Sequence, residues 1–220
     1  MRSALFAVYG ASGFGREVMP LARKHLHGLG APSDRLVFVD DAMCEGRILN
    51  GQRVIRYERF LAEPAEMRFS ALAIANDVVR EKLADRLQAD GVLPWSLKAA
   101  NVVVLDDVDV GEGALLCPFV TLTSNIRIGR QFHANIYSYV AHDCVIGDFV
   151  TFAPGVKCNG NVVIEDHAYI GTGAVIKQGR PGQPLVIGRG AVVGMGAVVT
   201  RDVPAGATVV GNPAKLLKKD

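Results

Sequence analysis

Apolar residues recur at every sixth position through most of the second half of the chain. Stepping by six from Val104 reaches Ile176 through thirteen positions that are all apolar, and the row two residues earlier is apolar or small. A helical face would recur at about 3.6 residues and a simple strand face at about 2, so neither explains this spacing. Period six is typical of short parallel strands that are joined by tight corners and coiled into a prism, with inward side chains stacked along its axis. The pattern therefore predicts an all-β parallel β-helix.

The six-residue register slips once. After Ile176 the next apolar positions in phase are Ile187, Val193 and Val199, so residues 177–185 (KQGRPGQPL) contain an insertion rich in Gly and Pro. Extra residues leave a solenoid as a loop on one face, which is often the binding face. We predict such a loop here.

Strand and helix signals alternate over the first 100 residues. Strands are predicted over residues 4–9, 35–39 and 71–75, and helices over residues 16–29 and 78–89. This alternation predicts a small parallel sheet with helices packed on it. The sequence thus predicts two domains, an α/β, small Rossmann-like domain over residues 1–100 and the β-helix over residues 101–220.

Charge and cysteine usage exclude several classes of protein. The 24 Lys and Arg against 22 Asp and Glu are spread thinly, so the basic stripe of a nucleic-acid-binding protein is missing. No apolar run approaches the roughly 20 residues that span a bilayer, and the first residues do not fit a signal peptide, so a cytoplasmic protein is expected. The four cysteines form no CxxC pair, which argues against zinc ribbons and redox pairs.

The hexads and the closing segment VVGNPAK at residues 209–215 resemble the hexapeptide-repeat acyltransferases. The whole chain is similar to the branch that acetylates nucleotide-linked 4-aminosugars or sialic acids. The matching segments include YGASGFGREV at residues 9–18, FVDD at 38–41, IANDVVREK at 74–82, AHDCVIGDF at 141–149 and IGTGAVIKQG at 170–179. The resemblance implies a left-handed β-helix, a homotrimer with active sites between subunits, acetyl-CoA as co-substrate and no metal.

Acyl transfer to an amine needs a base for the amine proton and donors for the developing oxyanion. His142 lies two residues beyond the inward Val140, and therefore at a corner of the coil. If three hexads make one turn, residue i+18 lies about 4.8 Å above residue i, which puts Gly160 over His142. The resemblance implies that His142 is the catalytic base, that Asp143 supports it, and that the Gly160 N–H contacts the acetyl carbonyl.

Acetyl-CoA is expected along the groove between neighbouring coils of two subunits. By position, the residues that would line it are Gly160, Gly171, Thr172, Gly194 and Met195, with Lys215 near a phosphate. Tight structural corners and a solvated tail are the alternative interpretation of the same residues. Some relatives carry a second histidine near the thioester where this chain has Thr151, so that contact is in doubt here.

The loop GASGFG at residues 10–15 follows a predicted strand and opens a helix, where backbone amides can hold a phosphate. Its GxxGxG spacing departs from the GxGxxG of dinucleotide-binding enzymes, so a dehydrogenase is disfavoured. Structural turn glycines are the alternative. The resemblance implies a sugar-nucleotide site made by Gly13, Phe14, Gly15, Asp40, Asp41, Asn76 and Arg80, although several relatives have His in place of Phe14.

The cysteines and histidines of the coil suggest two other kinds of site, an acyl-cysteine and a zinc site. Cys144 lies next to His142 but in the inward row, so a buried structural thiol is favoured over an acyl-cysteine. His133, His142 and His167 could suggest zinc, but their phases in the repeat differ, which leaves only ligation across a subunit interface.

The sequence therefore predicts an N-acetyltransferase that moves acetyl from acetyl-CoA to a UDP- or GDP-linked 4-amino-4,6-dideoxysugar in polysaccharide or glycan biosynthesis. One alternative is a sugar O-acetyltransferase of the sialic acid type, which the same site could serve. A second is a non-catalytic sugar-nucleotide-binding protein.

Overall fold

The computed structural model describes residues 4–44 and 46–217. The predicted domain ranges also include residues 1–3, 45 and 218–220, which lie outside the described residues. The chain divides into two compact units, Met1–Leu97 and Lys98–Asp220, which are described separately below. Among the described residues, no helix combines the length and the apolar character that a membrane crossing requires.

The first unit is built on a six-stranded sheet with the order β3-β4-β2-β1-β5-β6. Its pairings are parallel except between β3 and β4. All six residues of the central strand β1 are buried, as expected for a strand covered on both faces. The strands are β1 (Ala4–Tyr9), β2 (Leu36–Val39), β3 (Ile48–Leu49), β4 (Gln52–Ile55), β5 (Met67–Leu72) and β6 (Leu93–Pro94).

Three α-helices connect these strands: α1 (Gly13–Gly28), α2 (Tyr57–Ala62) and α3 (Asp77–Ala89). A single 3-10 turn, Ser33–Arg35, precedes β2. In α1, Val18, Met19, Ala22 and Leu26 are buried, a spacing that places them on one face. The predicted helices are confirmed, each with an earlier start, whereas α2 was not predicted.

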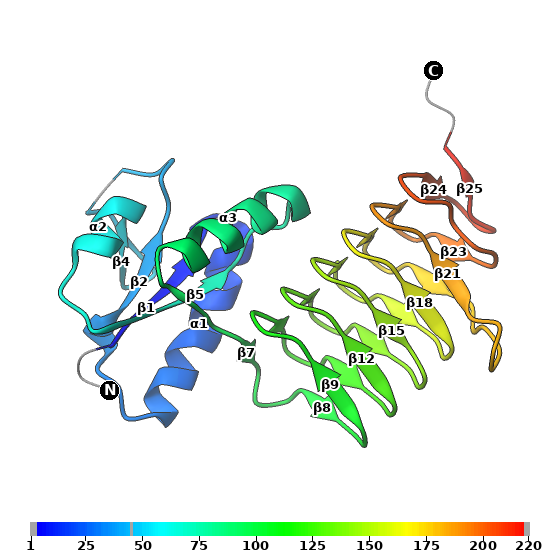
Figure 1. Ribbon diagram of the computed structural model, residues 1–220, viewed down its shortest axis with the longest axis horizontal. Coiled ribbons are helices and arrows are strands. Elements are labelled where there is room, and N and C mark those ends of the chain that lie inside the picture. Colours follow the sequence, from blue (N-terminus) through cyan, green and yellow to red (C-terminus); the bar gives the residue numbers. More distant parts are fainter. Residues whose placement is uncertain (1–3, 45, 218–220) are drawn as a thin grey trace. The chain divides into compact units, whose positions relative to one another are not determined.

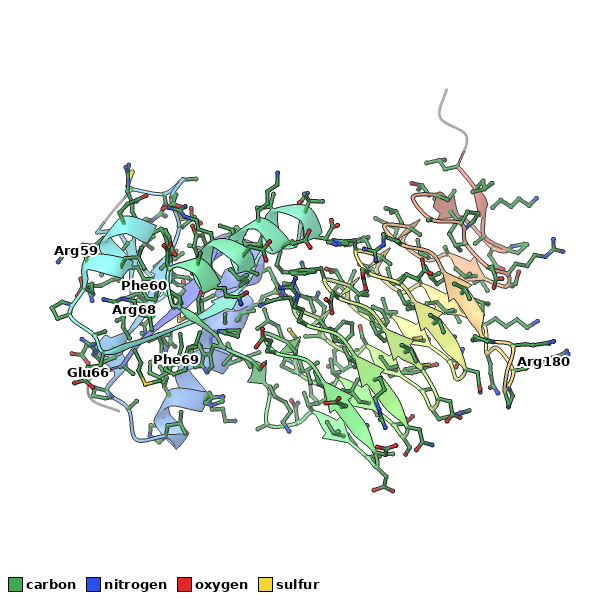
Figure 2. All side chains as sticks on the ribbon, viewed as in Figure 1. Arg59, Phe60, Glu66, Arg68, Phe69 and Arg180 are labelled. Atoms are coloured by element: carbon green, nitrogen blue, oxygen red, sulfur yellow. The ribbon has the colours of Figure 1, made fainter. Side chains whose placement is uncertain are left out.

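The strand predicted over residues 71–75 is misplaced by the sequence pattern. The observed strand β5 pairs with β1 from Met67 to Leu72, and residues 73–75 are outside it. Two polar residues, Arg68 and Ser70, interrupt the apolar pattern of this strand. Arg68 (Figure 2) donates to the carbonyls of Leu61 at 2.7 Å and Glu63 at 2.6 Å. It thereby supplies hydrogen-bond donors to carbonyls at the C-terminal end of α2, which have no partner within the helix.

The second unit is a parallel β-helix whose turns follow one another along a single axis (Figure 1). Three sheets form its faces, and each is named here for one of its strands. The β10 sheet contains β7 (Leu97–Lys98), β10 (Leu115–Leu116), β13 (His133–Ala134), β16 (Thr151–Phe152), β19 (Tyr169–Ile170), β22 (Val192–Val193), β24 (Thr208–Val210) and β25 (Lys215–Leu216). The β11 sheet contains β8 (Val103–Val104), β11 (Thr121–Leu122), β14 (Tyr139–Val140), β17 (Lys157–Cys158), β20 (Val175–Ile176) and β23 (Val198–Val199). The β12 sheet contains β9 (Val108–Val110), β12 (Ile126–Ile128), β15 (Val145–Ile146), β18 (Val162–Ile164) and β21 (Leu185–Ile187).

The register of these sheets fixes the length of a turn. Thr121 pairs with Tyr139, and Lys157 pairs with Val175, in each case 18 residues further along. Beyond the insertion Val163 pairs with Val186, which is 23 residues further. The predicted turn of three hexads and the predicted extra residues are both confirmed.

The inward rows form one continuous apolar core. Phe132, Phe152 and Ile170 are fully buried, and the core extends to Val209. The exceptions lie at the start of both rows, where Val104 is 39% exposed and Val102, Val108 and Val110 are half-buried. The strands in this first turn, β8 and β9, lie at the ends of their sheets, so each has a paired strand on one side only.

The corners of the coil are turned by residues in the left-handed backbone region. Positive φ recurs every six residues, for example at Asn125, Gln131, Tyr137 and Asp143. Asn and Asp accept this conformation more readily than other residues with side chains. Each such residue turns the chain from one face to the next, so the residue before it lies at a corner.

Candidate active site

His142 and Asp143 occupy the corner between the β11 and β12 sheets, where β14 ends and β15 begins. The His142 Nδ1 and the Asp143 Oδ2 are 2.7 Å apart, and about half of each side chain is exposed. Asp143 adopts a φ of 57°, and its N–H donates to the Ser124 carbonyl of the preceding turn. The pair is therefore held at the surface by the geometry of the corner.

The environment of Asp143 fixes the tautomer of His142. The hydrogen bond with His142 and a second from Asn125 Nδ2 at 3.3 Å hold the pKa of the Asp143 carboxyl below its usual value. An ionised carboxylate only accepts hydrogen bonds, so the His142 Nδ1 carries the hydrogen and donates it. The Nε2 lone pair is then free to take a proton, which is the arrangement a general base needs.

Gly160 lies against the imidazole of His142, one turn further along the coil. A Cβ at residue 160 would be 2.5 Å from both Cε1 and Nε2 of His142. The Asn161 N–H donates to the His142 carbonyl at 2.9 Å, which ties the two turns together. The geometric prediction that a spacing of 18 residues stacks Gly160 on His142 is thus confirmed.

Gly160 is buried beside the imidazole of His142. Its carbonyl accepts from the Gly179 N–H at 3.0 Å, but in the described part of the chain its N–H has no acceptor. A proton acceptor and a free amide donor therefore meet at one corner, and no side chain at residue 160 covers the space between them.

We predict that Asp143→Asn lowers kcat about 100-fold, because an amide cannot hold the Nδ1–H tautomer as a carboxylate does. The KM for acetyl donor should stay within about twofold, since Asp143 faces the imidazole. Steady-state kinetics measure both values. Asp109→Asn, an exposed change on β9, is the matched control, and an equal loss of kcat in both variants would contradict the assignment.

The same pair adds a pH-dependent contribution to stability. Because the pKa of Asp143 is lowered in the folded protein, the contribution is present above the ordinary pKa of an aspartate and is lost as the pH falls through the lowered value. Solvent exposure keeps this contribution small.

The other residues expected along acetyl-CoA gather at a different corner, between the β10 and β11 sheets. The Gly171 N–H donates to Val193 at 2.7 Å, and a Cβ at residue 171 would be 2.6 Å from the Met195 nitrogen. Thr172 accepts from the N–H of Gly196 one turn further on. Met195 is 81% exposed. Within one chain, then, only Gly160 of the expected set lies at the His142 corner.

Lys215 lies next to the second corner. It is exposed on β25 and is paired with Val210, whose Cγ1 would be 2.7 Å from a Cβ at Gly194. Gly194 also donates its N–H to the carbonyl of Val209. Gly194, Met195 and Lys215 therefore form a continuous strip at the C-terminal end of the coil.

The insertion starts one turn beyond Gly160, at the same corner. Gly179 donates to Gly160, and Leu185 donates to the Asn161 carbonyl at 3.1 Å. Between the insertion and the next turn lies a pocket of about 260 Å³ lined by Lys177, Gln178, Gly179, Arg180, Gln183, Pro184, Leu185, Thr200, Arg201 and Asp202. Arg180 itself extends from the loop away from the coil (Figure 2).

The N-terminal glycine loop is shaped by close backbone packing. Gly10 has a φ of 98°, and a Cβ there would be 2.9 Å from the Ala73 carbonyl oxygen. A Cβ at the buried Gly15 would collide with the Gly10 carbonyl, whereas Gly13 has open space around it. Phe14 is half-buried. Gly15 is therefore needed for the turn itself, and Gly13 leaves the start of α1 accessible.

The two acidic residues after β2 hold this loop in place. Asp40 accepts from the Ala11 N–H at 2.8 Å and from Ala42 at 3.0 Å. Asp41 accepts from the Tyr9 hydroxyl at 2.7 Å and from the Tyr57 N–H at 2.9 Å. Burial and the hydrogen bond to Asp41 raise the pKa of Tyr9, which keeps its hydroxyl protonated as the donor.

Asn76 and Arg80 order the loop that follows β5. The Asn76 Oδ1 accepts from Val79 at 2.9 Å and caps α3. Arg80 is fully buried and donates to the carbonyls of Ile74 at 2.7 Å and Ala75 at 3.2 Å. Burial lowers the pKa of Arg80 to about 10. Its guanidinium supports the loop, and direct contact with a ligand stays a prediction.

We expect Arg80→Ala to lower the free energy of unfolding by about 3 kcal/mol, because it removes these hydrogen bonds and leaves a cavity. Chemical denaturation measures the change. The exposed Lys82→Ala on the same helix should stay within about 0.5 kcal/mol of the parent. An Arg80→Ala protein as stable as Lys82→Ala would refute the supporting role.

Cys144 is buried in the core, as its place in the inward row predicted. Cys158 is buried in the core, and the hydrogen bond with Cys144 together with burial raises the pKa of its thiol. Thr151 pairs between His133 and Tyr169 on the β10 sheet. In residues 4–44 and 46–217, no three or more His, Cys, Asp or Glu side chains gather closely enough to hold a metal ion.

No family model matches the chain, but individual proteins of known sequence or structure do. A GDP-perosamine N-acetyltransferase of Escherichia coli O157:H7 is 52% identical over 215 residues, which are 98% of this chain and 97% of the relative. The structure of WeeI from Acinetobacter baumannii AYE is 62% identical, with a TM-score of 0.94 over 97% of this chain and 100% of that chain. The acetyltransferase domain of PglB from Neisseria gonorrhoeae FA1090, in complex with acetyl coenzyme A, is 30% identical, with a TM-score of 0.86 over 99% of this chain and 100% of that chain.

These likenesses extend over both units and include the His142 corner. The chain belongs to the hexapeptide-repeat acyltransferases, in the branch of acetyl-CoA-dependent N-acetyltransferases that act on nucleotide-linked aminosugars.

Proposed function

We propose that the chain transfers an acetyl group from acetyl-CoA to the 4-amino group of GDP-perosamine, a GDP-linked 4-amino-4,6-dideoxysugar, in polysaccharide biosynthesis. The observation that carries the proposal is the stacking of the free Gly160 amide on the His142 imidazole. The choice of GDP-perosamine rests on the relative of that name, which is 52% identical over nearly the full length of both chains.

The proposed reaction is direct attack within a ternary complex. The amine nitrogen forms a bond to the thioester carbon while the His142 Nε2 takes the proton from that nitrogen. The carbonyl electron pair moves to the oxygen, which accepts a hydrogen bond from the Gly160 N–H. The carbon–sulfur bond then breaks, and the leaving thiolate of CoA takes the proton from His142. Asp143 orients the imidazole and stabilises its cationic form.

We propose a homotrimer in which acetyl-CoA lies between neighbouring left-handed coils. The support is that the expected acetyl-CoA residues occupy two corners of one chain, Gly160 at one and Gly171, Thr172, Gly194 and Met195 at the other. A groove between two subunits joins the first corner of one chain to the second corner of its neighbour. Lys215 would then contact a phosphate of CoA. The PglB domain in complex with acetyl coenzyme A supports the co-substrate.

The first domain, residues 1–100, is proposed to be Rossmann-like and to bind the nucleotide part of the sugar nucleotide. In support, the loops after β1, β2 and β5 all follow the carboxyl ends of adjacent parallel strands, where such sheets bind ligands. These loops carry Gly13, Phe14 and Gly15, then Asp40 and Asp41, and then Asn76, with Arg80 behind them. The second domain, residues 101–220, supplies the chemistry, and the enzyme acts in the cytoplasm.

The test is an assay of the purified protein with acetyl-CoA and GDP-perosamine. The expected product carries one added acetyl group that survives mild base, because an amide resists conditions that cleave an ester. A base-labile product would show O-acetylation instead, and tight binding without any product would show a non-catalytic protein. Replacing the acceptor by its UDP analogue tests the choice of nucleotide.

A further inference from the structure

The buried thiol of Cys144 lies between the two turns that carry His142 and Gly160. Its Sγ is 3.2 Å from the carbonyl oxygen of Asn159 and 3.6 Å from that of His142. Cys144 is fully buried in the core, so it does not meet substrate. The proposed reaction makes no use of this thiol, yet it contacts the carbonyl of His142 and that of Asn159, the residue before Gly160.

The contact with Asn159 bears directly on the amide of Gly160. The Asn159 carbonyl and the Gly160 N–H belong to one planar, trans peptide unit and therefore point in opposite directions. A thiol that holds the carbonyl toward the core accordingly turns the N–H away from the core, and Gly160 itself lies against the imidazole.

The side chain of Asn159 secures the same peptide from outside. Its Oδ1 accepts from the Tyr139 hydroxyl at 2.9 Å, and its Nδ2 donates to the Ile176 carbonyl at 2.8 Å. Tyr139 is on β14, one turn before, and Ile176 is on β20, one turn after. Asn159 is thus tied to both neighbouring turns, which restricts rotation of the peptide that follows it.

We propose that Cys144, Asn159 and Tyr139 form a clamp that orients the Gly160 N–H toward the acetyl carbonyl. They are positioning residues, and the clamp rests on the proposed function of Gly160. An oxyanion donor contributes most when its direction is fixed before the reaction, so a freely tilting amide would stabilise the transition state less. The clamp gives the Cys144 thiol a positioning role in addition to its place in the apolar core.

The test compares Tyr139→Phe and Cys144→Ala with matched controls. Each variant removes one hydrogen-bond donor, and each is expected to lower kcat about tenfold while the KM for acetyl-CoA changes less than about twofold. Cys144→Ser keeps a donor and should recover most of the loss. Tyr169→Phe removes a hydroxyl from another outward strand position, and Val156→Ala opens a cavity in the same inward row, so both should keep parental kcat.

A spectroscopic readout separates failure of the clamp from failure of the proposed function. The infrared band of the thioester carbonyl of bound acetyl-CoA should lie at lower frequency in the parent than in Tyr139→Phe or Cys144→Ala, because a well-aligned N–H weakens that bond. This readout needs no acceptor and no turnover.

A parent protein that acetylates no GDP-linked sugar but shows the shifted band would refute the substrate and keep the clamp. Unchanged kcat and an unchanged band in both clamp variants would overturn the clamp. A fall in the controls equal to that in the variants would overturn it as well, because general destabilisation would then explain the loss.

Discussion

Replacing His142 by alanine is expected to lower kcat about a thousandfold, the largest effect of any single change in the coil. The imidazole carries its Nε2 beside Gly160, and the carboxylate of Asp143 is already engaged with Nδ1. The KM for acetyl-CoA should change little, because the residues proposed to line acetyl-CoA other than Gly160 lie at a different corner from His142. Steady-state kinetics at saturating sugar nucleotide measure both values.

His27→Ala is the control for this experiment, since His27 is an exposed histidine on α1. It should retain full activity. A His142→Ala enzyme that keeps more than about a tenth of the parental kcat would show that another group takes the amine proton. A loss confined to KM would instead assign His142 to binding.

Gly160→Ala is expected to lower kcat about a hundredfold without unfolding the coil. The added methyl carbon would be 2.5 Å from two atoms of the imidazole, so the ring must turn away from the corner. The exposed ring has room to move, because nearly half of its surface is in solvent. One methyl group thus displaces the proposed base and blocks the approach of the acetyl carbonyl to the Gly160 N–H. Steady-state kinetics measure the loss of activity, and a thermal melt shows whether stability has changed.

Gly28→Ala is the matched glycine control, because a methyl group at residue 28 would have no atom within 4 Å beyond its own helix backbone and chain neighbours. Its activity and melting temperature should match those of the parent. If Gly160→Ala retained parental kcat, the space between the imidazole and the amide would have no part in the reaction.

The geometry of the candidate site could be predicted because a β-helix converts sequence spacing into distance. Residues 18 positions apart lie in adjacent turns, so the pairing of His142 with Gly160 follows from the hexads alone. The same rule separates Gly171 from Gly160, because their spacing of 11 is no multiple of 18. Both were expected, by position, along one groove between two subunits, and the register shows that they occupy two corners of a single chain.

The α/β unit was harder to predict, because its strands depend on their neighbours. Residues 67–70 form a strand by pairing with β1 and β6, and Arg68 within them donates to carbonyls at the end of α2. The family resemblance implied that Arg80 contacts the sugar nucleotide. Its burial behind the loop of residues 74–75 could not be inferred from a sequence that shows neither burial nor hydrogen bonds.

The clamp residues were missed for a related reason. Asn159 precedes Gly160 and lies 20 residues after Tyr139, a spacing that places the two in neighbouring turns near one corner. That signal was available, but a hydroxyl–amide contact depends on side-chain rotamers, which spacing does not determine.

A structure of the enzyme with CoA and GDP-perosamine bound is the most direct test of the central claim. The account predicts that the sugar amine lies about 3 Å from the Nε2 of His142, with the sulfur of CoA beside the Gly160 N–H. A complex in which the amine and the sulfur meet at another corner, out of reach of both groups, would contradict it.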